Sequence, residues 1–370
     1  MSNEKNYLIS DQDSKIISVL KAILTIMIVM IHTHYNGINL ATGNSVFELP
    51  KWFEILKKIL SDVLPTCAVP GFFVISGVLL YKKPIDWKDN ILKKIRSLLV
   101  PYFIINTFWI VFYACVQLSP SLKVFFSNPD KIVADWGLLE YLDAYLGFGT
   151  SNAVHLIYGP LWFVRNLFVL NIFAPVIKKI IDKAPVLTAA ALLVLIVASW
   201  FIKGSSYTVT SIVYFAAGYY LVKYDIHFRD INKVNKPAVA AVYVSLIPLF
   251  FLSKGLFVHK VIKLLVIWVG LVFWTLASAT VISFRGGLLK LLELVYRYSF
   301  PIYIFHQIPT TILEKILITL FPETVLFMVL GYFATAIMIL CYCIGLSMAL
   351  ERWTPGIYGL LTGGRKKAKK

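Results

Sequence analysis

Apolar runs of roughly 17 to 25 residues, the length that a helix needs to cross a lipid bilayer, recur along almost the whole chain. Ten such runs have the approximate bounds 15–35, 62–81, 97–118, 160–178, 185–202, 207–222, 237–253, 262–282, 299–319 and 325–349. Soluble domains do not combine 59% hydrophobic with only 15% charged residues over 370 positions. The pattern predicts an all-α polytopic membrane protein, a bundle of about ten transmembrane helices.

Basic residues gather in short clusters between the apolar runs, and their placement predicts the orientation of the chain. If the N-terminus lies in the cytoplasm, 25 of the 36 Lys and Arg residues fall on the cytoplasmic side. Both termini are therefore expected in the cytoplasm, and residues 353–370 are expected to form a basic cytoplasmic tail that is attracted to anionic lipid. The scatter of the formal charge of +17 argues against a nucleic-acid partner. The four cysteines lie in or beside apolar runs, so neither a disulfide framework nor a metal site is expected.

The first apolar run contains two ionisable residues, Lys21 and His32, where such side chains are costly. Eleven positions return a helix to within about 20° of its starting face, so both side chains look the same way, about 16 Å apart along the axis. A lysine near a helix end also occurs where its side chain merely reaches the headgroups, and a buried histidine also occurs as a core residue. Together, the two residues indicate a polar line through the membrane.

A dense basic cluster precedes the third run. Lys93 and Arg96 are three residues apart and share one face of a helix. With Lys82 and Lys83 they form a cationic patch that suits phosphate oxygens, since a guanidinium group binds them through two hydrogen bonds. Ordinary cytoplasmic charge produces the same pattern, and charge alone does not separate the two interpretations.

Polar residues inside three other runs are further candidates. Ser76 precedes Gly77, which permits close helix packing, so Ser76 is either a packing residue or a nucleophile that needs a base beside it. Arg165 lies several residues inside the fourth run and is expected to face the protein interior or a wet cavity. Tyr303 and His306 fall on one face of the ninth run.

The longest segment predicted outside, residues 119–159, combines aromatic rings with carboxylates. This mixture suits a sugar-binding surface, because rings stack on sugar C–H faces and carboxylates accept hydrogen bonds from hydroxyls. Aromatic residues at the level of the lipid headgroups give the same composition. The residues concerned are Asp130, Asp135, Trp136, Glu140, Tyr141, Asp143, Tyr145, Phe148, His155 and Tyr158.

Taken in order from Leu20 to Gln307, these motifs resemble the acyltransferase-3 family of integral membrane acyltransferases, specifically its stand-alone branch of surface-polysaccharide O-acyltransferases. Five elements carry the resemblance: Lys21 with His32; Phe72, Phe73, Ser76 and Gly77; Lys93, Arg96, Pro101 and Tyr102; Trp162 and Phe163 after a Gly-Pro; and Ser299, Tyr303 and His306. Lysine stands at 21 and 93 where arginine is common in the family, which replaces a two-point contact with a point charge. The hydrolase-like domain that some relatives carry does not follow the last run.

The resemblance implies that residues 1–352 form one transmembrane acyltransferase domain in the cell membrane, the bacterial cytoplasmic membrane foremost. It implies transfer of an acyl group, acetyl foremost, from cytoplasmic acyl-CoA to a hydroxyl of a cell-surface glycan or its lipid-linked precursor, with no metal. His32 is the expected general base, Arg165 or Asn166 the stabiliser of the oxyanion, and His306 a group that binds the donor or orients a partner. Donor binding is expected from Lys21, Lys82, Lys83, Lys93 and Arg96, and substrate binding from Ser76, Trp162, Asn166 and Tyr303.

A transporter or flippase for a lipid-linked or polymeric glycan is the competing interpretation, with Lys21, His32, Arg165 and His306 along its pathway. A scaffold for an envelope complex is a third. Release of free CoA from acyl-CoA in the presence of an acceptor distinguishes the catalytic interpretation from transport. Oligomeric state, acyl group and acceptor sugar stay open at the level of the sequence.

Overall fold

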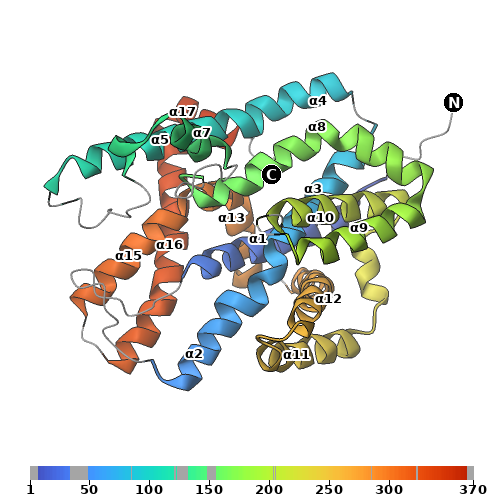
Figure 1. Ribbon diagram of the computed structural model, residues 1–370. Helices are drawn as coiled ribbons and strands as arrows, with labels where there is room; N and C mark the ends of the chain where they lie inside the picture. The colour runs from blue at the N-terminus through green and yellow to red at the C-terminus, as the bar shows by residue number, and fades with distance from the viewer. Residues whose placement is uncertain are drawn as a thin grey trace.

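The computed structural model describes residues 7–33, 49–84, 86–120, 122, 132–147, 156–202, 204, 206–284, 286–321 and 324–364. Every regular element in these residues is helical (Figure 1). The basic residues at 365–370 and part of the predicted outside segment, including Asp130, Phe148 and His155, lie outside the described residues. The predicted all-α class is confirmed for the described part of the chain.

Six continuous helical segments in the described residues are long and apolar enough to cross a membrane. They are Asp11–His32, Lys51–Tyr81, Trp87–Gln117, Gly159–Lys183, Val258–Val281 and Val325–Trp353. Two shorter apolar helices, α9 (Pro185–Ser199) and α11 (Lys236–Leu252), and the 18-residue α10 (Ser206–Lys223) correspond to three more of the predicted runs. The predicted count of about ten is therefore not confirmed, whereas the multi-pass character is.

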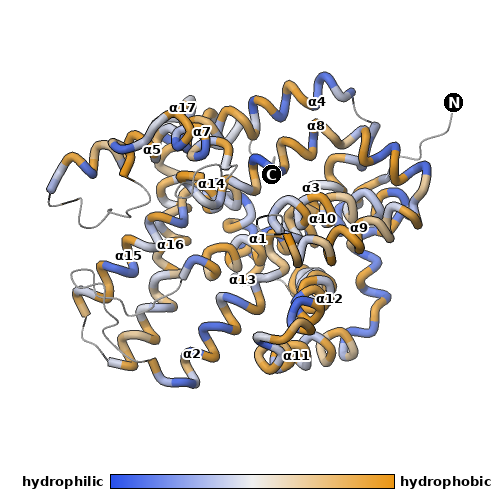
Figure 2. The backbone as a smooth tube through the Cα atoms, in the orientation of Figure 1, coloured by the Kyte–Doolittle hydropathy of each residue, from blue (hydrophilic) through white to orange (hydrophobic). Residues whose placement is uncertain are grey.

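Lipid-facing surfaces are recognisable from large apolar side chains that no other helix covers. Val186 and Leu187 on α9 are 79% and 72% exposed, and Trp353 at the end of α16 (Val325–Trp353) is 76% exposed. Figure 2 shows hydrophobic residues along most of the helices and hydrophilic stretches on α2 (Lys51–Lys58) and α4 (Trp87–Lys94). Such exposure is costly in water and favourable in a bilayer.

Helix α1 (Asp11–His32) lies in the interior of the bundle (Figure 1). It begins at a capping box in which Ser10 and Asp13 bond each other's backbone N–H groups, at 3.1 and 3.0 Å. Around it pack α3 (Ala68–Tyr81), α12 (Val258–Val281), α13 (Gly287–Arg297), α14 (Ser299–Phe305), α15 (Gln307–Leu320) and α16. Because neighbours surround α1, its polar residues face protein.

Helices α3 and α10 approach each other at paired glycines. A Cβ atom on Gly77 would collide with the carbonyl oxygen of Phe215, and one on Gly218 with the carbonyl oxygen of Val74. The expectation that Gly77 permits close packing is confirmed, and its partner is Gly218. The tight contact fixes the position of Ser76, which immediately precedes Gly77.

Two of the long segments contain a π-helical turn that ends two residues before a proline. The turn η1 (Ile59–Val63) and the 3-10 turn η2 (Leu64–Cys67, with Pro65) join α2 to α3, and η3 (Ile95–Leu99) joins α4 to α5 (Val100–Gln117, with Pro101). Proline has no N–H to donate to the carbonyl four residues back. The preceding residue reaches one position further, so Val100 donates to the carbonyl of Ile95. Turns of this kind are frequent at functional sites.

The ninth apolar run, predicted at 299–319, is not one continuous helix but consists of α14 and α15. The chain bends at His306, which separates α14 from α15. Pro309 explains the break, because its ring takes the place of the N–H that would bond the carbonyl of Phe305 and clashes with that carbonyl. His306 therefore lies at a bend, a position at which polar groups are common in membrane helices.

Candidate active site

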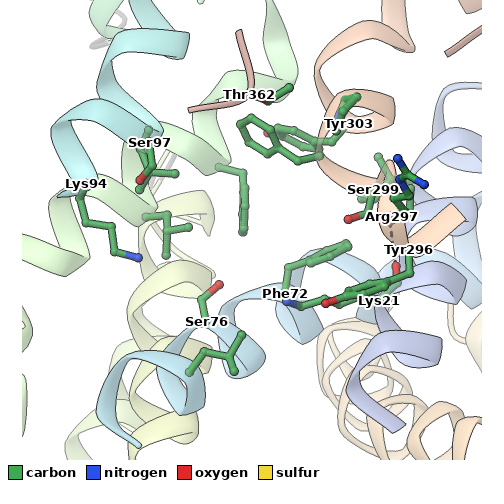
Figure 3. Close-up of a pocket in the computed structure, with 18 of the residues that line it drawn as sticks. Lys21, Phe72, Ser76, Lys94, Ser97, Tyr296, Arg297, Ser299, Tyr303 and Thr362 are labelled. Carbon is green, nitrogen blue, oxygen red and sulfur yellow. Dashed lines mark hydrogen bonds between the residues drawn. The ribbon is translucent and has the colours of Figure 1, made fainter. Parts of the chain in front are cut away.

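A cavity of about 630 Å³ lies between α1, α3, α4, α8 (Trp162–Lys183), α13, α14 and α17 (Pro355–Thr362). Its wall combines apolar side chains with cationic and hydroxyl groups. The polar members include Lys21, Ser76, Lys94, Ser97, Arg297 and Ser299. In Figure 3 the side chains of Lys21 and Lys94 extend into the cavity from opposite sides.

Three of the residues predicted to bind donor or substrate line this cavity: Lys21, Ser76 and Tyr303. The ammonium group of Lys21 lies 5.9 Å from the ring centroid of Tyr296, which stabilises a cation away from water. Phe72 and Phe163, both from the motifs described above, also line the cavity, and their ring centroids are 6.1 Å apart. One space therefore collects residues that are far apart in the sequence, with 282 positions between Lys21 and Tyr303.

The four residues of the predicted basic cluster lie outside the cavity lining. Lys82, Lys83, Lys93 and Arg96 do not line the cavity, whereas Lys94 does. Burial, and next the charge of Lys83, lower the pKa of Lys82. The cavity side of this segment carries Asn90, Lys94 and Ser97, one residue offset from the face that Lys93 and Arg96 share.

Sequence reasoning missed the contribution of Arg297 at the end of α13. Arg297 lies 3.1 Å from a carboxylate oxygen of Glu351, to which the Tyr298 hydroxyl also donates at 3.2 Å. Both Arg297 and Glu351 line the cavity. In the sequence, only the position of Arg297 indicates that it belongs to the site, because it lies shortly before Ser299 and Tyr303.

His32 and His306 lie together, although 274 residues separate them in the chain. Their ring centroids are 5.0 Å apart, with the ring planes at 54°. His306 is fully buried, and its Nδ1 lies 3.0 and 2.9 Å from the carbonyl oxygens of Ile302 and Tyr303. Because carbonyls only accept, Nδ1 carries the hydrogen and Nε2 is the acceptor atom. Nε2 is buried without a hydrogen-bond partner among the described residues, an arrangement that calls for an explanation.

The cavity leads along α1 toward this histidine pair. Lys21, Thr25 and Ile28 line it at successive turns, and His32 is the next residue on that face, about 6 Å further along the axis. Tyr303 lines the cavity, and its ring centroid is 6.3 Å from that of His306. The Tyr303 hydroxyl donates to the carbonyl of Pro160, which holds the ring at the boundary between cavity and histidines.

Arg165, Asn166 and Trp162 do not line the cavity. The Arg165 guanidinium donates to the carbonyl oxygens of Leu146 and Gly147, the latter at 3.2 Å, at the C-terminal end of α7 (Leu138–Leu146). A cation at unsatisfied C-terminal carbonyls stabilises a helix end.

Asn166 and Trp162 pack between helices. The Asn166 side chain accepts from Arg165 at 3.1 Å and contacts the hydroxyl of Ser211 on α10 at 3.3 Å. The Trp162 ring lies 4.6 Å from that of Tyr207. These contacts pack α8 against α10 beside the cavity.

A family model described as an acyltransferase domain, acyltransferase-3, matches residues 15–349. The match includes both histidines, Lys21 and the cavity walls from α1 to most of α16. Comparison with curated proteins and comparison with solved structures found no match. With a matching segment that covers most of its length and membrane-spanning helices throughout, the chain belongs to the acyltransferase-3 family and is a multi-pass membrane acyltransferase.

Proposed function

We propose that the protein is an O-acyltransferase of the bacterial cytoplasmic membrane that transfers an acyl group, acetyl foremost, from acyl-CoA to a hydroxyl of a cell-surface glycan or its lipid-linked precursor. The observation that carries the proposal is the cavity with cationic walls that follows α1 from Lys21 toward the paired rings of His32 and His306. A donor with a phosphorylated end and a long neutral arm matches this distribution of charge.

The phosphates of the donor bind at Lys94 and Arg297, where two cations on different helices line the same cavity. The pantetheine arm passes Lys21 and lies against Thr25 and Ile28. The axial separation of Lys21 and His32, about 16 Å, is comparable with the length of that arm. If the basic side of the protein is cytoplasmic, the donor enters from the cytoplasm and the acceptor reaches the histidines from the opposite side.

His32 acts as general base in this proposal. It takes the proton of the sugar hydroxyl while the hydroxyl oxygen attacks the thioester carbonyl, and a tetrahedral oxyanion forms. Collapse of this intermediate forms the ester and breaks the C–S bond, and His32 returns the proton to the departing CoA sulfur. The ring centroids of His306 and His32 are 5.0 Å apart, and the acceptor atom Nε2 of His306 orients the His32 ring or the hydroxyl through a hydrogen bond. Arg165, bound to the end of α7, has a structural role that supports the wall of the bundle.

Replacement of His32 tests the proposal. Purified His32→Ala protein is expected to release free CoA from acetyl-CoA and glycan acceptor at least about 100-fold more slowly than wild type. The reason is that a general base typically accelerates a reaction by about this factor or more. His306→Asn retains a donor near Nδ1 for the carbonyls but removes the Nε2 acceptor, and it is also expected to lose activity while remaining inserted. His259→Ala is the matched control, because His259 bonds Ser253 at 3.0 Å and neither residue lines the cavity.

Thiol release is followed with a chromogenic reagent, and insertion with gel filtration in detergent. Wild-type activity in the His32→Ala variant would contradict the catalytic role. The transport alternative predicts no release of CoA by any variant, the wild type included.

A further inference from the structure

Two asparagines in the wall of the cavity have polar atoms that the catalytic proposal does not use. The first is Asn171 on α8, which is 1% exposed and whose side-chain Nδ2 donates to the carbonyl oxygen of Leu167 at 2.7 Å. This bond assigns the amide, because a carbonyl oxygen only accepts, so the other terminal atom is the acceptor Oδ1. Oδ1 is buried without a hydrogen-bond partner among the described residues. A ligand in the cavity that carries an N–H or O–H group would satisfy it.

The second is Asn90 on α4, which has the complementary deficit. Its Nδ2 atom is buried and has no acceptor among the described residues. Asn90 lines the cavity one helical turn before Lys94, and Ser97 lines it one turn after (Figure 3 labels the last two). Helix α4 packs against α8. The two contacting helices therefore offer the cavity one buried acceptor and one buried donor.

Asn171 lies at the end of the cavity away from the histidine pair. The α8 wall consists of Phe163, Leu167 and Asn171, so Asn171 is about 12 Å along the helix axis from Phe163. The Phe163 ring lies 5.6 Å from the ring of Tyr303, whose centroid is 6.3 Å from that of His306. Phe163 thus marks the histidine end of this wall, and Asn171 the opposite end.

Asn90 also lies toward the end away from the histidines. Further along the same helical segment, the Trp109 ring stacks on Tyr158 with centroids 5.5 Å apart. The Tyr158 hydroxyl accepts from the N–H of Gln307, the residue that follows the second histidine of the pair. The segment therefore approaches the level of the histidines as it runs from Asn90 to Trp109. Asn90 is about 6 Å further from that level than Lys94 along the helix axis.

A group that satisfies both asparagines presents a hydrogen-bond donor beside an acceptor. The edge of adenine does so, with an exocyclic amino group next to a ring nitrogen, and asparagine amides suit this edge. In acyl-CoA the adenosine is joined to the phosphates at the end opposite the acyl group. With the phosphates at Lys94, the adenine is expected beyond Lys94 on the side away from the histidines, where Asn90 and Asn171 lie.

We propose that Asn90 and Asn171 bind the adenine base of the acyl-CoA donor. Oδ1 of Asn171 accepts from the exocyclic amino group, and Nδ2 of Asn90 donates to the neighbouring ring nitrogen. This inference rests on the proposed function, because it takes acyl-CoA as the donor. The secondary amides of the pantetheine arm also present a donor and an acceptor, so the experiment separates the two parts of the molecule.

The experiment measures binding by calorimetry to the purified full-length protein in nanodiscs. The ligands are CoA, a CoA analogue with hypoxanthine in place of adenine, and pantetheine, which lacks the nucleotide. Wild type is expected to bind the hypoxanthine analogue about tenfold or more weakly than CoA, because a carbonyl oxygen replaces the amino group and meets Oδ1 of Asn171. The Asn171→Leu variant is expected to bind CoA about tenfold more weakly, to lose the preference for adenine, and to bind pantetheine as wild type does.

Thermal stability distinguishes a binding role of Asn171 from a structural one. Leucine removes a buried acceptor that has no partner in the described residues, so the melting temperature without ligand is expected to be unchanged or higher. A second variant, Asn90→Ala, is expected to show the same loss of CoA affinity and of base preference. Asn106→Leu is the matched control, since Asn106 is a fully buried asparagine on α5 that does not line the cavity. It is expected to bind all three ligands as wild type does.

The outcomes separate this inference from the proposed function. If wild type fails to bind CoA, the proposed function itself fails. If wild type binds CoA and the asparagine variants keep its affinity and its preference for adenine, only the present inference is overturned. Equal losses of CoA and pantetheine binding in Asn171→Leu would assign the asparagines to the pantetheine arm and would also overturn it.

Discussion

Lys94 and Lys93 show how much a single position matters in a membrane cavity. Both are lysines at the end of α4, and the sequence favours Lys93 because it shares a helix face with Arg96. The structure brings Lys94, and not its neighbour, into the cavity. Neighbouring residues on a helix are rotated by about 100°, so the two ammonium groups serve different surroundings.

The pair provides a matched test of where the donor phosphates bind. Lys94→Gln is expected to raise the KM for acyl-CoA about tenfold with little change in kcat, because a charge-assisted hydrogen bond to phosphate is lost from ground and transition states alike. Lys93→Gln is expected to change KM much less. Steady-state kinetics over a range of acyl-CoA concentrations checks both, and a larger effect at Lys93 would restore the assignment made from the sequence.

At the scale of elements, prolines position the polar groups. Pro101 accompanies the π-helical turn that presents Ser97 to the cavity and to Gly363, and Pro309 breaks the ninth run at His306. In both cases the missing N–H changes the backbone of the preceding turn. The position of His306 beside His32 therefore depends on Pro309, a residue three positions further along the chain that has no catalytic group.

Pro309→Ala tests this dependence. Alanine restores the N–H that bonds the carbonyl of Phe305, so α14 and α15 become more nearly continuous and His306 moves relative to His32. Acyl transfer is expected to fall about 10- to 100-fold, as for a misplacement of roughly 1 Å in a catalytic group, while the melting temperature is unchanged or higher. Pro248→Ala inside α11 is the control, since it removes a comparable proline away from the cavity. Full activity of Pro309→Ala would show that the bend does not position His306.

For the molecule as a whole, orientation is the property on which the direction of transfer depends. The structure contains long apolar helices and a cavity with basic walls, and the distribution of Lys and Arg predicts that this side faces the cytoplasm. Lys88 lies at the start of the third segment, Trp87–Gln117, and Ala134 follows its end, so the two positions are expected on opposite sides of the membrane.

Cysteine labelling in cells checks the orientation. In a background in which the four native cysteines are replaced by alanine, an impermeant maleimide is expected to label Ala134→Cys in intact cells. It is expected to label Lys88→Cys only after the membrane is permeabilised. The reverse pattern would place the cavity opening outside and rule out a cytoplasmic donor.

The helical class and the common face of Lys21 and His32 follow from the sequence, because both depend on the regular period of one helix. The contact of His32 with His306 does not, because it depends on how α14 packs against α1. About ten spans are predicted because hydropathy detects apolar runs and does not show whether a run stays continuous, and six continuous segments in the described residues are long and apolar enough to cross a membrane. Pro309 was visible as a helix breaker, but its effect on the ninth run was not recognised. The catalytic and binding roles of these residues stay predictions.

Helix α1 fixes the spacing between Lys21 and His32, because it is one continuous helix at the centre of the bundle. Lys21 and His32 belong to one helix, so under the proposed function the number of residues between them sets the reach of the donor arm. One inserted residue would shift His32 by about 1.5 Å and turn it by about 100°, away from both the cavity face and His306. Side chains between the two positions can vary in size as long as they remain apolar and the number of residues stays constant. Under the proposed function, we therefore expect activity to depend on the length of this segment.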